Sequence, residues 1–426
     1  MSNIIEITRQ IKIDSTQMSL LGGDLRNQAL AAIATALEEN KEKIFDANKI
    51  DLDKAAKADL ASPIVKRLKF DEHKLADVIA GINSLITLKD PLWNKLMERE
   101  LDTGLTLSKV TCPIGVIGVI FESRPDALVQ IATLCLKSGN CAILKGGSEA
   151  AHTNKALFEV IYSAGTNSGV PKGFLTLIEN RAEIDELLKC HEAIDLLIPR
   201  GSNEFVQYIM SNSKIPVMGH ADGVCHIYVD EAADIKKAIP IIVDAKTQYV
   251  AACNTVETLL VHKEKAGELL PLLKAAFDEK LVTIRGCQKT REIISCEAAA
   301  DVDFDTEYLD YIISIKLVDG IDEAISHINR YGSHHTDSII TEDAAAAEKF
   351  MLLVDSAGVY QNCSTRFADG FRYGFGAEVG ISTGKLHARG PVGLDGLVTY
   401  KFKLYGNGQV VADYADGRSS FHFKDL

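Results

Sequence analysis

Short apolar runs alternate with amphipathic stretches over most of the chain, and this alternation limits the possible fold more than any other feature of the sequence. The first series of apolar runs covers residues 115–121, 141–145, 174–178, 193–198 and 224–229. Stretches with helical spacing lie between them, for example at 154–164 and 203–211. Apolar strands that alternate with helices are typical of a parallel sheet covered by helices on both faces. The sequence therefore predicts an α/β fold.

Other patterns predict the rest of the architecture. A second series of runs at 255–261, 311–318, 336–340 and 358–360 predicts a second α/β domain. Residues 1–90 repeat apolar side chains at helical spacing, which predicts a helical N-terminal part. Residues 98–113 alternate around the turn-forming Asp102-Thr103-Gly104, as a β-hairpin does, and residues 396–411 alternate like a further strand. In a monomer such strands would have unpaired edges, so we expect them to pair with each other and with another subunit.

The composition excludes several classes of protein. The 426 residues carry a formal net charge of −13, whereas nucleic-acid-binding surfaces are usually basic, so we expect no nucleic-acid partner. The nine cysteines form no CxxC pair and no zinc-site spacing, so we expect no metal. Residues 110–121 are shorter than the roughly 20 residues of a membrane helix, and residues 1–10 do not resemble a secretory signal. We therefore expect a cytoplasmic protein without a membrane partner.

Local sequence around several polar residues leaves their roles open. Cys253 lies among small residues at an expected helix-to-strand junction, which suits either an accessible nucleophile or a buried, inert thiol. Lys145 ends an expected strand before two glycines, and Gly201 and Ser202 follow another strand. Strand ends of this kind hold ligands in open α/β sheets, but a solvated turn is the alternative. Residues 374–380 and 380–386 lack the spacing of the nucleotide-binding glycine motifs.

Residues 318–339, which include Gly332-Ser333-His334-His335-Thr336-Asp337, resemble the signature of the γ-glutamyl phosphate reductase family within the aldehyde dehydrogenase superfamily. Residues 252–262 and 385–394 are also similar to this family, and the resemblance runs from about residue 10 to the C-terminus. It implies a Rossmann-type cofactor-binding domain at 1–97 and 114–245 and an α/β catalytic domain at 246–390. It also implies a hairpin and tail for oligomerisation at 98–113 and 391–426.

The resemblance also implies a set of functional residues. Cys253 matches the family's nucleophilic cysteine. The residues implied to bind the cofactor, NADPH or NADP, are Lys145, Ser148, Glu149, Gly201, Ser202 and Glu307. The residues implied to bind the substrate or its oxyanion are Arg124, Asn254, His335, Lys385 and Arg389. Arg124 stands where hydrolytic aldehyde dehydrogenases have an oxyanion-binding asparagine, and its planar fork suits a phosphoryl or carboxylate group.

The implied reaction is the NADPH-dependent reduction of L-glutamyl 5-phosphate to L-glutamate 5-semialdehyde, through a cysteine thioacyl intermediate. Residues 217–221 lack the glutamate that activates water in hydrolytic relatives, as expected if hydrolysis would waste that intermediate. The expected partners are this small-molecule substrate, a second copy of the chain and, transiently, glutamate 5-kinase. Two rival interpretations are an ordinary semialdehyde-oxidising dehydrogenase and a scaffold that has lost catalysis. The missing glutamate argues against the first, and the presence of Cys253, Lys145 and Glu307 together argues against the second.

Overall fold

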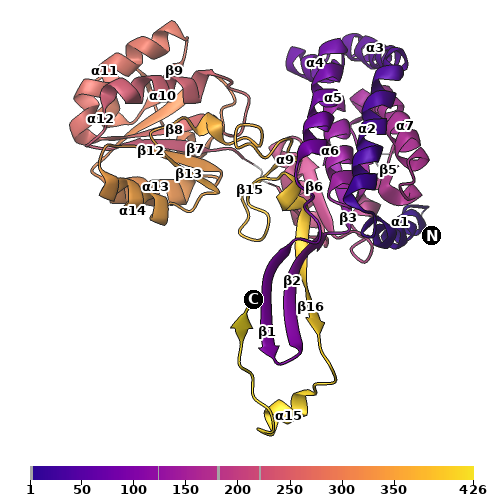
Figure 1. The fold of residues 1–426 in the computed structure, drawn as a ribbon. Coiled ribbons are helices and arrows are strands. Elements are labelled where there is room, and N and C mark those ends of the chain that lie inside the picture. Colours follow the sequence, from indigo (N-terminus) through magenta and orange to yellow (C-terminus); the bar gives the residue numbers. More distant parts are fainter. Residues whose placement is uncertain (1–2, 123, 180–182, 220–221) are drawn as a thin grey trace. The chain divides into compact units, whose positions relative to one another are not determined.

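The computed structural model describes residues 3–122, 124–179, 183–219 and 222–426. The chain divides into two compact units, which are described separately (Figure 1). The first unit holds Met1–Met218, Gly376–Gly380 and Val392–Leu426, and the second holds Gly219–Phe375 and Ile381–Pro391. In the described parts of the chain, no helix is both long enough and apolar enough to cross a membrane.

A four-stranded parallel sheet with the order β5-β4-β3-β6 forms the centre of the first unit. Its segments are β3 (Val116–Phe121), α6 (Pro125–Lys137), β4 (Cys141–Lys145), η1 (Ser148–Ala150), α7 (Ala151–Asn167), η2 (Lys172–Phe174), β5 (Leu175–Leu177), α8 (Glu183–Leu187), β6 (Leu196–Arg200) and α9 (Asn203–Asn212). The N-terminal helices are α1 (Asn3–Met18), α2 (Gly23–Glu39), α3 (Lys41–Lys57), α4 (Ser62–Leu68) and α5 (Glu72–Thr87). Every residue of β3 is buried, as expected of a central parallel strand.

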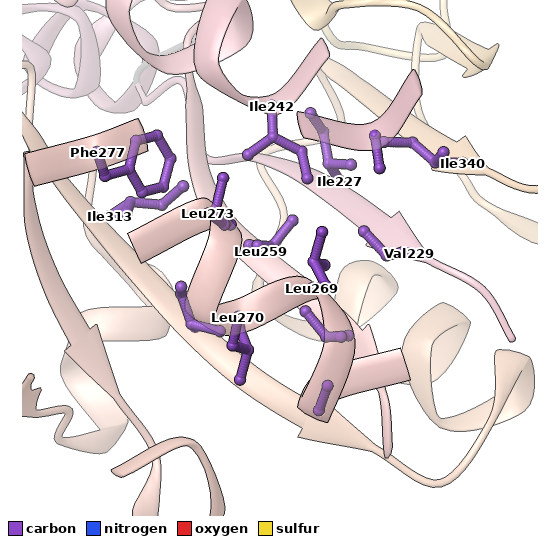
Figure 2. Packing of buried hydrophobic residues seen from close by; sticks show 14 of the residues in the cluster. Ile227, Val229, Ile242, Leu259, Leu269, Leu270, Leu273, Phe277, Ile313 and Ile340 are labelled. Carbon is purple, nitrogen blue, oxygen red and sulfur yellow. The ribbon is translucent and has the colours of Figure 1, made fainter. Parts of the chain in front are cut away.

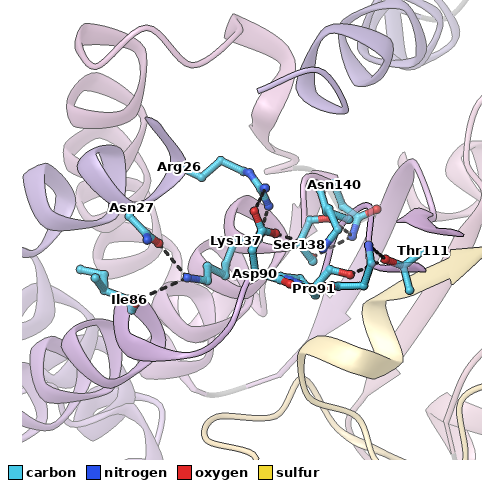
Figure 3. Close-up of polar contacts among 11 residues, drawn as sticks. Arg26, Asn27, Ile86, Asp90, Pro91, Thr111, Lys137, Ser138 and Asn140 are labelled. Carbon is cyan, nitrogen blue, oxygen red and sulfur yellow. Dashed lines mark hydrogen bonds and ion pairs between the residues drawn. The ribbon is translucent and has the colours of Figure 1, made fainter. Parts of the chain in front are cut away.

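A buried polar network joins three helices of this unit (Figure 3). The guanidinium of Arg26, in α2, donates to the carbonyl of Lys137, in α6, and its Nη2 lies 2.6 Å from Oδ2 of Asp90. The Nζ atom of Lys137 donates to Oδ1 of Asn27 at 2.7 Å and to the carbonyl of Ile86, in α5, at 3.2 Å. Because a buried charge without partners is costly, these contacts fix α6 against α2 and α5.

The predicted hairpin and tail strand form one antiparallel sheet with the order β16-β2-β1-β17. The hairpin strands are β1 (Lys95–Asp102) and β2 (Leu105–Pro113), and the tail contributes η5 (Leu394–Leu397), β16 (Val398–Tyr405), α15 (Val411–Ala415) and β17 (Lys424–Asp425). Gly104 has a φ of 74° in the hairpin turn, a conformation that favours glycine. The predicted pairing of the tail with the hairpin is confirmed, since Val398 pairs with Pro113 and Tyr405 with Thr106.

A seven-stranded sheet with the order β10-β9-β11-β8-β7-β12-β13 forms the second unit, and all neighbouring strands in it are parallel. The segments up to β11 are β7 (Cys225–Val229), α10 (Ile235–Thr247), β8 (Val256–His262), α11 (Lys263–Glu279), β9 (Thr283–Gly286), α12 (Gln288–Arg291), β10 (Glu297–Ala298), η3 (Asp301–Asp305) and β11 (Ile312–Val318). The remaining segments are α13 (Ile321–Tyr331), β12 (Thr336–Ile340), α14 (Ala344–Leu353), β13 (Gly358–Gln361), η4 (Thr365–Phe367), β14 (Ile381–Ser382) and β15 (Gly390–Pro391).

Successive residues of the central strands of this sheet point to opposite helical layers. Ile227 and Val229 of β7 pack in a cluster with Leu269 and Leu273 of α11 (Figure 2). Tyr228, which lies between them in the chain, packs in a separate cluster with side chains of α13 and α14. Because both faces are covered, the strands are apolar throughout, and this is the pattern from which the α/β fold is predicted.

The two units divide at Met218 and Gly219, not at the expected boundary between residues 245 and 246. Residues 225–229 form β7, which pairs with β8 on one side and β12 on the other. Backbone hydrogen bonding therefore assigns the last strand of the first predicted series to the second unit. An apolar run cannot show from its own sequence which of two sheets it joins.

We expect the hairpin–tail sheet to bind a second copy of the chain. The strand β16 lies at an edge of this sheet and exposes Tyr400, Phe402 and Leu404, which are 50%, 56% and 56% exposed. Light scattering at micromolar protein should therefore return at least two chain masses. Phe402→Glu should shift the mass towards one chain, whereas Thr399→Glu, on the other face of β16, should change it less. A wild-type mass of one chain would contradict this prediction.

Candidate active site

Four neighbouring strands of the second unit bring the residues that precede them to one edge of its sheet. In the strand order β11-β8-β7-β12, Glu307 lies before β11 and Cys253 before β8. Gly223 lies before β7, and His335 immediately precedes β12. Because parallel strands point the same way, residues separated by more than 100 positions in the sequence are gathered at the amino edge of the sheet.

Cys253 and His335 form the central contact of this site. The Sγ atom of Cys253 lies 3.2 Å from Nε2 of His335. The imidazole is buried, and its Nδ1 lies 2.9 Å from Oγ1 of Thr336. A thiol beside an imidazole that a third group holds in place is the arrangement of an activated nucleophile. The half-buried Cys253 thus has a partner that can accept its proton.

The backbone of Cys253 also contacts the first residue of β7 and the segment that leads into it. The Sγ atom of Cys225 donates to the Cys253 carbonyl at 3.2 Å, and burial raises the pKa of Cys225, so this thiol keeps its proton. A Cβ atom on Gly223 would lie 2.3 Å from the Cys253 carbonyl oxygen and 2.6 Å from Oε1 of Glu307. Gly223 therefore allows Cys253 and Glu307 to approach the same point.

A buried ion pair lies on the segments that flank Cys253. Nζ of Lys246, near the end of α10, is 2.6 Å from Oε2 of Glu257 in β8, and both side chains are fully buried. Burial raises the pKa of Glu257 to about 7 and lowers that of Lys246. Glu257 also accepts from the backbone N–H of Leu309 at 3.4 Å. Both carboxylate oxygens are thus engaged, so this group does not act as a free base.

His335 is one of the predicted substrate-binding residues of this unit and lies against Cys253, and the others separate into two groups. Asn254 lies beside the nucleophile, and its Nδ2 donates to the Ala368 carbonyl at 2.8 Å. Lys385 and Arg389 instead both pair with Asp355, at 2.6 Å and 3.0 Å. The Lys385 contact, followed by that of Arg389, lowers the pKa of Asp355. Two cations on one carboxylate leave one positive charge available to an anion.

His226 and His327 are buried near the site, and their contacts indicate structural roles. His226 contacts Oδ1 of Asp337 through both its backbone N–H, at 2.7 Å, and its Nδ1, at 3.2 Å. The ring of His327 packs 5.5 Å from that of His226, and burial lowers the pKa of His327 to about 3. His327 is therefore neutral and does not exchange protons near neutral pH. Within the described residues, no group of His, Cys, Asp and Glu side chains is arranged to hold a metal ion.

The first unit holds most of the predicted cofactor-binding residues. Lys145 ends β4, is buried, and donates from Nζ to the Gly146 carbonyl at 2.5 Å. Ser148 and Glu149 follow in η1. A pocket of 270 Å³ opens at this point, lined by Gly146, Gly147, Ser148, Ala151, His152, Asn154, Lys155, Leu177, Ile178 and Glu179. A larger pocket of 800 Å³, between α1 and residues 189–193, contains none of the predicted site residues.

The predicted pyrophosphate turn carries a carboxylate. Ser202 caps α9, and its backbone N–H donates to Oε2 of Glu122 at 3.2 Å. A Cβ on Gly201 would lie 2.7 Å from the same oxygen. Arg124 stands at the N-cap position of α6 and is half-buried. The roles of these residues in cofactor and substrate binding stay predictions.

Two parts of the site lie beyond what the sequence predicts. Of residues 217–221, where no glutamate is present, His220 and Ala221 lie outside the described residues. Arg366 in η4 is buried beside the segment that carries Cys253, and it is not among the site residues that the sequence predicts. Its only signal is a pair of arginines, Arg366 and Arg372, in a short stretch without periodicity.

Comparison with known proteins agrees with this fold. A model of the aldehyde dehydrogenase family matches residues 5–293. The γ-glutamyl phosphate reductase of Acetivibrio thermocellus is 59% identical over 419 residues, which cover 98% of this chain and 97% of the relative. That of Ruminiclostridium cellulolyticum is 60% identical over 409 residues, covering 96% and 95%. The crystal structure of γ-glutamyl phosphate reductase from Thermotoga maritima superposes with a TM-score of 0.94 at 40% identity, covering 96% of this chain and 100% of that one.

The fold and these matches define the chain as an enzyme of the aldehyde dehydrogenase family. The sequence identity to these relatives, over nearly their full lengths, shows which enzymes of that family the chain belongs with. The chain belongs to the γ-glutamyl phosphate reductases, as the resemblance in the sequence predicts.

We expect Gly223→Ala to disrupt the site but not the fold. The added methyl group would overlap the Cys253 backbone and Glu307 at less than 3 Å, so Cys253 must move. Turnover should fall at least about tenfold, because small misplacements of reacting groups are costly. Gly267→Ala in α11 is the matched control, since nothing lies within 4 Å of its Cβ position. Activity assays with thermal unfolding measure both variants, and equal activities would contradict the described packing.

Proposed function

We propose that the chain catalyses the NADPH-dependent reduction of L-glutamyl 5-phosphate to L-glutamate 5-semialdehyde with release of phosphate, the second step of proline biosynthesis from glutamate. One observation carries the proposal: Cys253 Sγ lies 3.2 Å from His335 Nε2 in a chain that is 59% identical to a γ-glutamyl phosphate reductase. An acyl phosphate is a strongly activated acyl donor, and a thiolate is the nucleophile that can accept its acyl group.

The first step is attack on the acyl carbon. His335 accepts the proton of Cys253, and the Sγ anion adds to the acyl carbon, which forms a C–S bond and an oxyanion. The oxyanion then collapses and breaks the C–O bond to phosphate. Phosphate leaves, and a thioacyl group remains on Cys253. Backbone N–H groups near Cys253, together with Asn254 and Arg124, are the proposed donors to the oxyanion that forms in between. Lys385 and Arg389 are the proposed cations for the anionic substrate.

The residues of the first unit suit a dinucleotide. Glycines at 146 and 147 and the hydroxyl of Ser148 line a pocket at the carboxyl end of β4, a usual position for nucleotides in α/β sheets. We propose that Lys145 and Glu149 contact the adenosine ribose and its phosphate. Gly201 and Ser202 are the proposed contacts of the pyrophosphate. Glu307, of the second unit, is the proposed contact of the nicotinamide ribose. When bound, NADPH supplies the hydride that reduces the thioacyl group. Cys253 then leaves as thiolate from the resulting hemithioacetal, and the semialdehyde is released.

Phosphate dependence tests this function against that of a hydrolytic oxidising dehydrogenase. In the reverse direction, semialdehyde and NADP should give sustained formation of reduced cofactor only when phosphate or arsenate is added. Without it, turnover should stop after a burst, because general-base help to water is typically worth 10²–10⁴-fold and no glutamate is present at 217–221. Absorbance of the reduced cofactor measures both phases.

Two cysteine variants control this experiment. Cys253→Ala should remove the burst and the sustained phase together. Cys287→Ser should keep both phases, although the pKa of Cys287 is lowered: burial alone would raise it, but the hydrogen bonds from Thr290 and backbone groups together outweigh burial. Sustained oxidation without phosphate would favour the hydrolytic dehydrogenase, and no reaction under any condition would favour a scaffold without catalysis.

The choice of cofactor depends, in our proposal, on Lys145. A cation there favours the 2′-phosphate, so NADPH should be preferred over NADH. Lys145→Ala should weaken NADPH about 10–100-fold more than NADH, the range of one charge-assisted contact. Lys155→Ala is the matched control, because Lys155 is a lysine that lines the pocket beginning at Gly146 and pairs with Glu179 at 3.2 Å. Titration of cofactor fluorescence checks this, and a selective loss in the control alone would assign the contact to Lys155.

A further inference from the structure

Arg366 is a buried guanidinium on the segment that packs against the loop before β8. It belongs to η4 and is only 8% exposed. Its Nε donates to Oε1 of Gln248, directly after α10, at 3.0 Å. Its guanidinium carbon lies 6.0 Å from the ring centre of Tyr249. Arg366 therefore lies over the start of the loop that ends at Cys253.

A second contact fixes the other end of the same loop. Asn254, next to the nucleophile, donates to the carbonyl of Ala368 at 2.8 Å. Within the loop, Oγ1 of Thr255 donates to the Tyr249 carbonyl at 2.7 Å and closes it. Residues 366–368 and 248–254 are thus held together at two points, one on each side of Cys253. This arrangement holds the guanidinium close enough to Cys253 for the two groups to interact electrostatically.

Arg366 lacks the carboxylate partner that a buried arginine usually has. Among the described residues, no Asp or Glu oxygen forms an ion pair with it, and its one side-chain hydrogen bond is that of Nε. Asp369 and Asp244 act on Arg366 only at longer range, and Asp369 pairs instead with Arg372 at 3.5 Å. Burial, followed by the charge of Arg372, lowers the pKa of Arg366, but a guanidinium stays protonated at neutral pH. Burying such a charge is costly unless an anion compensates it.

We propose that Arg366 binds an oxyanionic group of the acyl substrate through its two terminal nitrogens. Nε is occupied by Gln248, which orients the planar fork, and Nη1 and Nη2 remain for bidentate recognition of a carboxylate or phosphate. This oxyanionic group is either the phosphate that leaves the substrate when Cys253 attacks, or the α-carboxylate at the far end of the glutamyl chain. This inference rests on the proposed function and adds a specificity-determining residue to it.

The test measures KM for semialdehyde and for phosphate separately in the phosphate-dependent oxidation. Arg366→Met keeps the volume and removes the charge, and Arg366→Lys keeps the charge and removes the fork. Arg366→Met should raise one of the two KM values about 10–100-fold, and Arg366→Lys should raise the same value less. A higher KM for semialdehyde assigns the α-carboxylate, and a higher KM for phosphate assigns the phosphoryl group. Arg330→Met, at an exposed position of α13, is the control and should change neither value.

Failure of this inference differs from failure of the proposed function. If wild-type protein shows no phosphate-dependent turnover, the proposed function fails. If wild-type protein turns over and both Arg366 variants keep both KM values within about twofold, the inference is overturned. Thermal unfolding shows whether each variant is folded, and Arg366→Lys decides the result if Arg366→Met does not fold. Equal losses in kcat with both KM values unchanged also overturn it, because they indicate only a structural role.

Discussion

The contact between Cys253 and His335 depends on the parallel register of β8, β7 and β12. His335 precedes β12 directly, and β12 pairs with β7 from Ser338 and Ile227 onward. In turn, β7 pairs with β8 from Cys225 and Val256. A shift of one residue in either ladder would move a strand start by about 3.3 Å and exchange the faces of its side chains. The 3.2 Å contact therefore exists only while both buried faces of this sheet are packed.

Buried polar contacts keep this register at the amino edge. Asp337, the second residue of β12, accepts hydrogen bonds from both the backbone and the ring of His226 in β7, and from Oγ of Ser356. Cys225, next to His226, donates to the Cys253 carbonyl. Each of these groups would be left unpaired if the strands slipped, at a cost of about 1–3 kcal/mol per buried group. The apolar faces hold the sheet together, and the polar contacts select one alignment of it.

Most elements of the fold can be predicted from the sequence, because the apolar runs have the lengths of strands and the intervening stretches have the period of helices. The sheet to which β7 belongs cannot be predicted in this way, since pairing is set by partners far away in the chain. The same holds within the site. Cys253 looks either reactive or inert from its neighbours alone, and the family resemblance, not local physics, favours the nucleophile. Arg366 and the carboxylate of Glu122 become visible only when the fold places them beside Gln248 and Ser202.

The first unit is interrupted in the sequence by the second, and its last strands come from the end of the chain. The segment Val392–Leu426 returns to the first unit, where β16 pairs with β2 nearly 300 residues after β2 is made. During synthesis, the second unit is therefore complete before the first can close. Throughout that interval β2 has β1 on one side and an open row of backbone groups on the other. An open edge can pair with other chains, so the growing protein is exposed to such pairing until Val398–Tyr405 has left the ribosome.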